Sequence, residues 1–406
     1  MTSNEERETF VPPRITIPIG PQHPALKEPG MFKLILDGEQ IVDAEVNISY
    51  NHRGIEKATE GNLHTQNLYL LARICGICSA THNGNYAQAV EFAAEKEPPE
   101  RAKFIRTLTW ELDRVHSHML WFGVAAHEIG FETLFMYAWR DRELSLDMLE
   151  DLSGARIHHD MNSIGGVRRD ISDELAHSLL KRLDKLEEQM DYYLNTAIKE
   201  RSLLNRVEDV GVLETSMAKS HGAVGPTARG SNVPVDVRFT DPTQAYPHLI
   251  DTGNWDMILS DRCDVAGRTI VRLKEIVQAI EMSRWLIENL PDGDIQTRMS
   301  PRVDPNEVVA RHEAPRGELV HYLVTNGTSK PERVKIRAPT HANWCSMEHT
   351  LRGYQIADAP IILAAIDPCY SCTDRIALVD AEDDSIEIVS KEQLRVRANK
   401  AYEENK

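Results

Sequence analysis

The sequence predicts a mainly α-helical protein with small β pieces, an α+β fold in which a large helical body carries an N-terminal β lobe. Long stretches between residues 63 and 290 repeat apolar residues at helical spacing, which favours the helical body. Near both ends of the chain, apolar and polar residues alternate around an Asp-Gly or an Asn-Gly pair. Such dipeptides are typical of tight hairpin turns, so short strands are expected at both ends.

The β lobe is expected within the first 60 residues. Residues 1–11 are polar and acidic and are expected to form a loosely tied arm. Residues 14–19 lead into Gly20-Pro21-Gln22-His23-Pro24, whose composition indicates a loop. Residues 32–36 and 41–48 alternate on either side of Asp37-Gly38, which predicts the first hairpin.

Apolar periodicity and capping signals predict five principal helices. They are expected at residues 79–95, 100–122, 144–152, 172–204 and 258–290. Residues 172–204 place leucines and aromatic residues on one face, as an amphipathic helix does. Residues 211–238 are rich in Gly, Pro and Ser and are expected to be irregular. A second hairpin is predicted at residues 317–337, around Asn326-Gly327.

Composition and charge exclude several classes of protein. The net charge of −17 would repel phosphates, so no nucleic-acid partner is expected. No apolar run approaches the roughly 20 residues that span a bilayer. The acidic N-terminus does not resemble a secretory signal, and the chain has no glycine-rich phosphate-binding motif. We therefore expect a cytosolic chain whose six cysteines are reduced.

Four of the six cysteines form two Cys-x-x-Cys pairs, Cys75/Cys78 and Cys369/Cys372, separated by most of the chain. In a reducing compartment, such pairs indicate metal binding or redox chemistry. Four thiolates suit structural zinc, an iron–sulfur cluster or nickel, and ligand softness does not distinguish these metals. Zinc modules usually keep both pairs close in sequence, which disfavours structural zinc here. Cys263 and Cys345 are single and are expected to be small buried apolar residues.

The two cysteine motifs resemble those of the large, catalytic subunit of [NiFe]-hydrogenases. The resemblance rests on Arg73-Ile-Cys-Gly-Ile-Cys-Ser79, with His82 and Glu91 downstream, and on Asp367-Pro-Cys-Tyr-Ser-Cys-Thr-Asp-Arg375. Further motifs are similar to the energy-converting, membrane-bound branch (group 4): Gly20–Pro24, His52–Lys57, Gly165–Asp170 and Asp261-Arg262. That branch is related to the quinone-site (49 kDa) subunit of respiratory complex I, which lacks the paired cysteines.

The resemblance implies a fold, a cofactor and a reaction. The fold would be that of a [NiFe]-hydrogenase large subunit, similar to the complex I 49 kDa subunit. The cofactor would be a Ni–Fe(CN)2(CO) centre, with Cys75 and Cys369 as terminal nickel ligands and Cys78 and Cys372 bridging nickel to iron. The implied reaction is the reversible conversion of two protons and two electrons into H2.

The resemblance also implies partners. A small iron–sulfur subunit would carry electrons, with ferredoxin as the indirect donor, and membrane subunits would translocate ions. The chain would then be a peripheral subunit on the cytoplasmic side of the membrane.

Residues outside the cysteine pairs also match functional residues of that family. Glu56 matches a glutamate that takes protons from the Cys369 sulfur; otherwise it is an ordinary surface carboxylate paired with Arg53 or Lys57. Arg316 matches an arginine over the open face of the metals, acting with Asp367; otherwise it is a surface arginine in a turn.

Some polar residues of the helical body carry further expectations. His82 matches a histidine that hydrogen-bonds a bridging sulfur; otherwise it is an ordinary core histidine. Asp113 is expected to be a second carboxylate near Arg316. His116 and His118 are two positions apart on one helix and should face different ways. His158-His159-Asp160 has no partner motif.

The second cysteine motif also suggests where the chain can be divided. In many hydrogenases the large subunit is trimmed just after this motif, which here ends at Arg375. We therefore expect an N-terminal arm and β lobe (residues 1–60), a helical catalytic body with the C-terminal metal motif (61–375) and a tail that maturation can remove (376–406). Two alternatives to a hydrogenase remain. One is a complex I-like redox subunit that reduces sulfur compounds or quinone, and the other is a scaffold with zinc or no metal.

Overall fold

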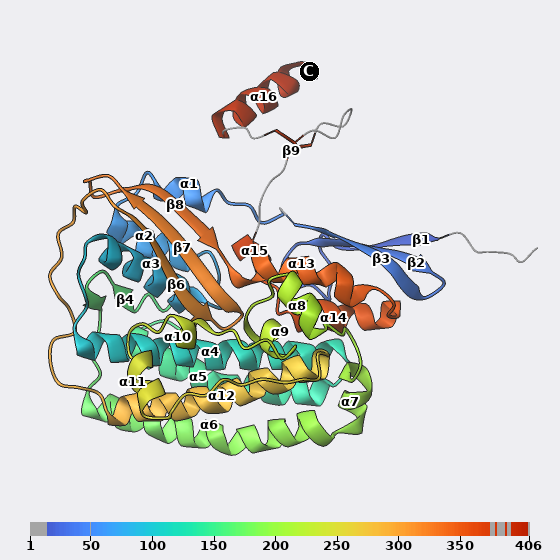
Figure 1. The fold of residues 1–406 in the computed structure, drawn as a ribbon, viewed down its shortest axis with the longest axis horizontal. Coiled ribbons are helices and arrows are strands. Elements are labelled where there is room, and N and C mark those ends of the chain that lie inside the picture. The colour runs from blue at the N-terminus through green and yellow to red at the C-terminus, as the bar shows by residue number, and fades with distance from the viewer. Residues whose placement is uncertain (1–13, 49, 374–377, 380–385, 388–390, 405–406) are drawn as a thin grey trace, which may run out of the picture.

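The computed structural model describes residues 14–48, 50–373, 378–379, 386–387 and 391–404. Within these residues the chain is mainly helical, with small antiparallel sheets, as the sequence predicts (Figure 1). Among the described residues, no helix is both long enough and apolar enough to cross a membrane. The position of trimming, Arg375, lies outside the described residues.

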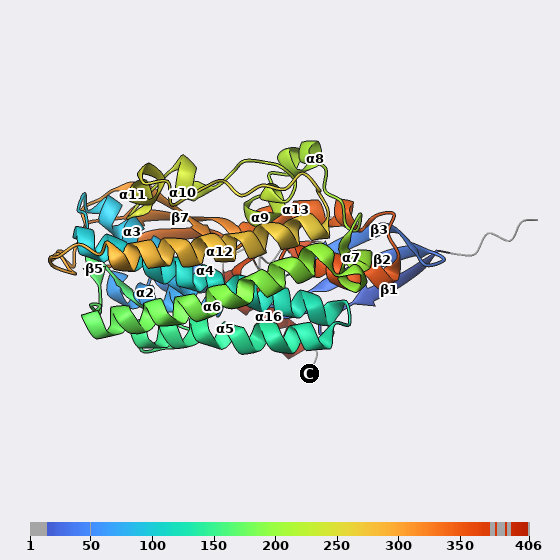
Figure 2. The same ribbon diagram turned by 90° about the horizontal axis from the view of Figure 1, so that it is seen from below.

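Four long helices form a layer along one side of the molecule and run along its long axis (Figure 2). They are α4 (Glu100–Glu128), α5 (Glu132–Ser153), α6 (Asp173–Lys199) and α12 (Val265–Glu288). Their buried leucines, methionines and aromatic residues make up the largest hydrophobic core. The helix expected at 144–152 is the second half of the longer α5, because the apolar face of that helix begins much earlier, with buried Leu134 and Ala138.

Capping residues explain two further differences from the predicted helices. The helix expected at 172–204 ends at Lys199, because Glu200 is extended (ψ 110°) and caps the following α7 (Arg201–Val207) by accepting from the Ser202 amide. The helix expected from residue 258 begins only at Val265. There Asp264 accepts a hydrogen bond from the Gly267 amide at 2.7 Å, as an N-cap does.

The N-terminal sheet has the order β1-β2-β3 and is antiparallel. Its strands are β1 (Ile15–Ile19), β2 (Met31–Asp37) and β3 (Gln40–Asn47). The predicted hairpin is confirmed as β2–β3, whereas β1, expected only as a lead into a loop, pairs with β2. Phe32 and Leu34 of this sheet share a hydrophobic core with Trp344, Leu363 and Tyr370. The sheet therefore packs beside the second cysteine motif.

A second three-stranded sheet covers the other side of the cysteine motifs. It consists of β6 (Glu307–Ala314), β7 (Gly317–Thr325) and β8 (Pro331–Arg337), in that order. The hairpin expected at 317–337 is confirmed as β7–β8, and β6 is an additional strand. Helices α1 (Ile55–Thr59) and α3 (Ser79–Ala93) lie against this sheet, and α2 (His64–Ala72) packs on α3 (Figure 1).

Short elements connect these layers. Residues 211–238, expected to be irregular, hold the short helices α8 (Thr215–Ser220) and α9 (Gly225–Arg229) and the start of α10 (Val237–Thr240). The remaining elements are β4 (Asn162–Ser163), β5 (Gly166–Val167), α11 (Tyr246–Asp251), α13 (Pro339–Leu351), the 3-10 turn at Ile356–Asp358, α14 (Ala359–Ala365), α15 (Tyr370–Thr373), β9 (Leu378–Val379), β10 (Ile386–Glu387) and α16 (Lys391–Glu404). In Figure 1, α16 lies apart from the body of the molecule.

Candidate metal centre

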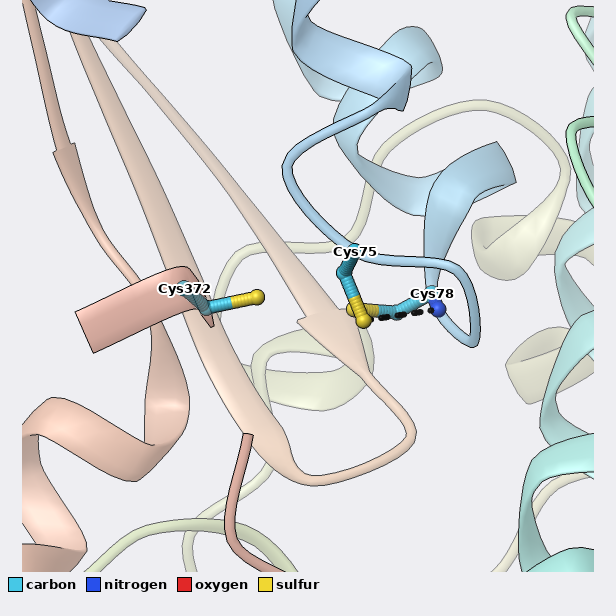
Figure 3. Close-up of side chains that lie close together, drawn as sticks. All are labelled: Cys75, Cys78 and Cys372. Atoms are coloured by element: carbon cyan, nitrogen blue, oxygen red, sulfur yellow. Dashed lines mark hydrogen bonds between the residues drawn. The ribbon is translucent and has the colours of Figure 1, made fainter. Parts of the chain in front are cut away.

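The two Cys-x-x-Cys pairs meet at one buried point. Cys75 and Cys78 lie on the loop between α2 and α3, while Cys369 precedes α15 and Cys372 lies on it. All four are buried, and Cys372 points from α15 toward Cys75 and Cys78 (Figure 3). The Sγ atoms of Cys75, Cys78 and Cys372 lie within 4.8 Å of one another. The Sγ of Cys369 is 3.4 Å from that of Cys75 and 2.8 Å from that of Cys372.

These separations bring the four sulfurs close to the spacing of a shared metal centre, although the 2.8 Å between Cys369 and Cys372 is shorter than that spacing. A tetrahedral metal with bonds of about 2.3 Å holds its sulfur ligands about 3.8 Å apart. Hydrogen bonds from Cys369, Cys372 and Cys78 hold the pKa of Cys75 well below its usual range, whereas burial raises the pKa of Cys372 well above it. Cys75 is therefore the cysteine that loses its proton most easily. A metal cation could displace the protons of the other three thiols, and all four sulfurs would then be thiolate ligands.

The N-terminal loop before β2 clamps the second cysteine motif in place. A carboxylate oxygen of Glu28 accepts hydrogen bonds from the backbone amides of Tyr370 (2.8 Å) and Ser371 (3.2 Å), and the Ser371 hydroxyl donates to the other oxygen. These amides are at the start of α15, where they have no partner within that helix. Arg53 holds the first motif by donating to the carbonyls of Arg73 (2.7 Å) and Ile74 (2.8 Å).

Arg316 and Asp367 form a buried pair beside the sulfurs. Arg316 lies on the β6–β7 turn and donates through Nε to the Asp367 carbonyl (2.7 Å) and through Nη2 to its carboxylate (3.0 Å). Lys27 adds a second ion pair to the same carboxylate at 3.1 Å. Burial raises the pKa of Asp367, but the positive charges of Arg316, Lys27 and Arg272 outweigh it and hold that pKa at about 2. Asp367 is therefore ionised at neutral pH.

Backbone packing fixes the position of Arg316. Gly225, in the left-handed region at φ 65°, lies so close to this turn that a Cβ atom there would be 2.2 Å from the Arg316 carbonyl oxygen. One guanidinium nitrogen, Nη1, is buried and has no hydrogen-bond partner among the described residues. Burial lowers the pKa of Arg316, but the charge of Asp367, followed by those of the cysteines, outweighs it and raises that pKa. The arginine is thus a fixed cation with a free donor near the sulfur cluster.

Glu56 lines a cavity that reaches the sulfur cluster. The cavity has a volume of about 200 Å³, and its lining includes Glu56, Ser371 and Cys372. The Glu56 carboxylate accepts hydrogen bonds from the Ile336 amide (3.0 Å) and from Lys335 (2.9 Å). Lys335 is 49% exposed, so the carboxylate lies between the cavity and solvent. Glu56 thus forms an ion pair with Lys335 of strand β8.

His82 lies next to Cys372. Its Nε2 is 3.6 Å from the Cys372 sulfur, and its Nδ1 is 3.3 Å from Nε2 of His321 on β7. Burial lowers the pKa of His82 to about 4, so its imidazole is neutral at pH 7. The structure therefore brings His82, Arg316 and Asp367 to the four cysteines, with Glu56 on the wall of the adjoining cavity.

Comparisons with known proteins agree with this geometry. Residues 128–303 and 296–375 match the family described as "Respiratory-chain NADH dehydrogenase, 49 Kd subunit", and residues 53–129 match the family described as "Nickel-dependent hydrogenase". The chain is 37% identical over 403 residues to the membrane-bound hydrogenase subunit alpha of Pyrococcus furiosus, which covers 96% of this chain and 94% of that protein. The chain belongs to the [NiFe]-hydrogenase large-subunit family, in its membrane-bound branch related to the complex I 49 kDa subunit.

Two further proteins are similar to this family member over most of their length. The chain is 38% identical to the carbon monoxide-induced hydrogenase of Rhodospirillum rubrum, over 89% of this chain and 99% of that protein. A solved structure of the membrane-bound sulfane sulfur reductase, an archaeal respiratory membrane complex, contains a chain with a similar fold. Its TM-score is 0.84 at 31% identity, covering 89% of this chain and 98% of that chain. The predicted fold of a large subunit is therefore confirmed.

The expectation that two single cysteines are buried was wrong, since Cys345 is exposed and Cys263 is half-buried. Within His158-His159-Asp160, Asp160 pairs with Arg73 at 2.5 Å and His159 lies 3.4 Å from Asp113. Asp113 contacts this histidine and the Thr81 hydroxyl. Its expected place near Arg316 stays a prediction.

A network of buried charges lies under the β6–β7 turn of this large subunit, and no motif in the sequence indicates it. Arg229 donates to Glu275 (2.8 Å) and to Glu313 (2.7 Å) and pairs with Asp236 (2.9 Å). Arg114 donates to the Glu313 carbonyl at 2.7 Å, which holds the end of β6 near Arg316. Burial and the charge of Asp236 raise the pKa of Glu313 to about 7.

Four residues that support the site were not predicted from the sequence. Lys27, Glu28 and Arg53 hold the two cysteine motifs, and His321 holds His82. The one available signal was proximity in sequence: Lys27 and Glu28 follow the Gly20–Pro24 motif, and Arg53 lies within His52–Lys57.

Proposed function

We propose that this chain is the catalytic subunit of a membrane-associated [NiFe]-hydrogenase complex, which interconverts protons, electrons and H2. The single observation that supports the proposal most strongly is the convergence of four buried cysteine sulfurs from two ends of the chain. Cys75, Cys78, Cys369 and Cys372 would hold a Ni–Fe(CN)2(CO) centre. That centre, when bound, supplies the metal chemistry that makes and breaks the bond of H2.

The residues around the sulfurs would prepare the site for this chemistry. Arg316 is a fixed cation with a free Nη1 donor, and a buried donor of this kind stabilises negative charge that develops nearby. Asp367 orients Arg316 through two contacts and lowers the net positive charge around it. His82, which is neutral, donates or accepts one hydrogen bond at the Cys372 sulfur and so tunes its basicity.

Glu56 would carry protons between the sulfur cluster and solvent. Cys372 and Ser371 line the cavity of Glu56 and Cys369 does not, which favours Cys372 as the sulfur closest to the relay. Lys335 then offers the carboxylate a route to the exposed surface. A relay of this kind needs a group that gains and loses a proton within hydrogen-bond reach of both ends of its path.

Electrons and ions would pass through other subunits. Apart from the two pairs, Cys263 and Cys345 are single, so the chain offers no second four-cysteine set for an iron–sulfur cluster. We therefore propose a partner iron–sulfur subunit, with reduced ferredoxin as the indirect donor and membrane subunits that translocate ions. The chain would lie peripherally on the cytoplasmic side of the membrane. The names of the Pyrococcus and Rhodospirillum relatives both support a hydrogenase, and the Pyrococcus name also supports a membrane-bound one.

A second candidate is a complex I-like subunit that reduces sulfur compounds or quinone. The structural similarity to a chain of the sulfane sulfur reductase complex favours it, as does the match to the 49 kDa family. Metal analysis of the purified complex, with infrared spectroscopy and activity assays, separates the candidates. Nickel and iron in equal amounts, bands of bound carbon monoxide and cyanide, and H2 evolution from a reduced dye are expected. Sulfur reduction without H2 evolution would favour the second candidate, and zinc or no metal would leave only a scaffold.

A further inference from the structure

A second group of buried titratable side chains lies beside the first cysteine loop and has no role in the chemistry above. Asp113 and His116 lie on α4, and His159 lies on the loop after α5. The carboxylate oxygen Oδ1 of Asp113 is 3.4 Å from Nε2 of His159 and 3.6 Å from Nε2 of His116. All three side chains are fully buried. Such a set could hold either a metal ion or a proton, and the surrounding hydrogen bonds decide between them.

Hydrogen bonds exclude His116 as a metal ligand at this point. Nη2 of Arg142 lies 2.9 Å from Nδ1 of His116, and a guanidinium can only donate, so Nδ1 accepts. In the neutral ring, the proton must then lie on Nε2, which donates to the carbonyl of Ile77 at 2.9 Å. Burial and the charge of Arg142 lower the pKa of His116 well below its usual value, so the ring is neutral at pH 7. Its Nε2 therefore has no free lone pair for a metal.

The same reasoning shows which ring nitrogen of His159 carries the proton. It also shows a contact between two atoms that lack a hydrogen bond. Nδ1 of His159 lies 3.1 Å from the carbonyl of Ala155, which can only accept, so Nδ1 carries a proton. Nε2 of a neutral His159 then presents a lone pair to Oδ1 of Asp113. Neither atom has another hydrogen-bond partner within the described residues. If Asp113 were ionised, two buried acceptors would face each other, which costs about 1–3 kcal/mol for each unsatisfied group.

We propose that Asp113 and His159 form a dyad that holds one buried proton, carried by the Asp113 carboxyl and offered to Nε2 of His159. A neutral acid–imidazole pair satisfies both atoms without separating charge in the protein interior. The other oxygen of the acid is already oriented, since the Thr81 hydroxyl donates to it at 3.3 Å. Burial also raises the pKa of Asp113, and the charge of Cys75 raises it further, against the influence of His159.

The dyad is placed to respond to the charge of the sulfur cluster. The groups that face Asp113 are Thr81 from α3, His116 from its own helix, His159 and, at longer range, the Cys75 thiolate. His116 contacts the dyad and donates to Ile77, at one end of the cysteine loop. Arg53, on the side of Glu56, donates to Ile74 at the other end. The dyad is therefore a proton site separate from Glu56. Its response to oxidation and reduction rests on the proposed function, but the shared proton does not.

Infrared spectroscopy of the purified complex tests the shared proton directly. A protonated carboxylic acid has a carbonyl band apart from that of carboxylates, and the band shifts in D2O. We expect one component of this band at neutral pH in the parent to be lost in Asp113→Asn and to shift in His159→Gln, where the acceptor changes. The component from Glu313, whose pKa is about 7, should stay in both variants. Glu132→Gln is the matched control, because Glu132 forms an exposed pair with His127 at 2.8 Å and should not contribute to the band.

Three outcomes decide the inference. Absence of the band in the parent, or a band that Asp113→Asn leaves unchanged in intensity, would overturn it, and His159→Gln alone would decide if the asparagine variant failed to fold. An additional metal ion per chain that is lost in either variant would show a metal site in place of the dyad. A band that is present but unchanged by reduction of the complex would support the shared proton while counting against its link to redox chemistry at the cysteines.

Discussion

Replacing Glu56 with glutamine separates a role in proton transfer from a role in folding. The glutamine side chain has the same shape, and its amide oxygen can still accept the hydrogen bond from the Ile336 amide. The ion pair with Lys335 is lost, but Lys335 is 49% exposed, and exposed pairs contribute only about 0.2–1 kcal/mol. We therefore expect the unfolding midpoint and the metal content of the Glu56→Gln complex to stay close to those of the parent.

The effect on activity should be much larger than this. A positioned acid–base group contributes about 10²–10⁴-fold to a rate, and glutamine cannot carry a proton. We expect H2 evolution with a reduced dye, and exchange of H2 with D2O, to fall by about 100-fold or more. Infrared bands of the metal ligands should be unchanged. The control is Glu60→Gln, which removes a carboxylate one turn away that pairs with Arg333 of the same strand β8. Full activity in Glu56→Gln, or an equal loss in both variants, would refute the relay.

Three further predictions concern the groups around the cysteines. Asp367→Asn leaves the buried Arg316 and the partly buried Lys27 without their counter-charge, so thermal or denaturant unfolding should show a loss of about 3–5 kcal/mol. Glu28→Ala removes the cap of α15, and because hydrogen bonds to a charged group are each worth about 1.5–3 kcal/mol, nickel per chain should fall. Glu313 has a pKa raised from 4.5 to about 7, so the folded state binds more protons than the unfolded state between these values. Stability should therefore decline as the pH rises from about 4.5 to 7, and Glu313→Gln should flatten that decline.

Each of these predictions has a contradicting result. Unchanged stability of Asp367→Asn would mean that the two cations are solvated in the folded protein. Full nickel content in Glu28→Ala, compared with a variant of the exposed Glu39, would show that the cysteine motif holds its shape without the clamp. A parent whose stability is constant over that pH range would show that Glu313 is ionised throughout it.

Local signals in the sequence predicted most elements of the fold. Asp37-Gly38 and Asn326-Gly327 placed two hairpins, because these dipeptides adopt the turn that joins twisted strands. The N-cap residue Asp264 is also a local signal for the start of a helix, but the apolar residues before it suggested that the helix began earlier. Strands β1 and β6 were missed because each is defined by its pairing with a neighbour and has no turn dipeptide of its own next to it.

Some residues of the site could likewise be predicted from the sequence, and others could not. The Cys-x-x-Cys spacing indicated a four-sulfur centre, and the structure brings those sulfurs together. The ion pair of Lys27 with Asp367 joins residues 340 positions apart, and neither neighbouring sequence indicates the other. His159 meets Asp113 only because the loop after α5 folds back over α4. Contacts of this kind depend on how helices pack, which a pattern within one segment does not contain.

X-ray absorption at the nickel edge of the purified complex tests the central claim most directly. The account predicts a nickel ion with a first shell of sulfur ligands and an iron atom as a near neighbour, both lost when Cys372 is replaced by serine. A complex that lacks nickel, or holds it among nitrogen and oxygen ligands, would contradict the account.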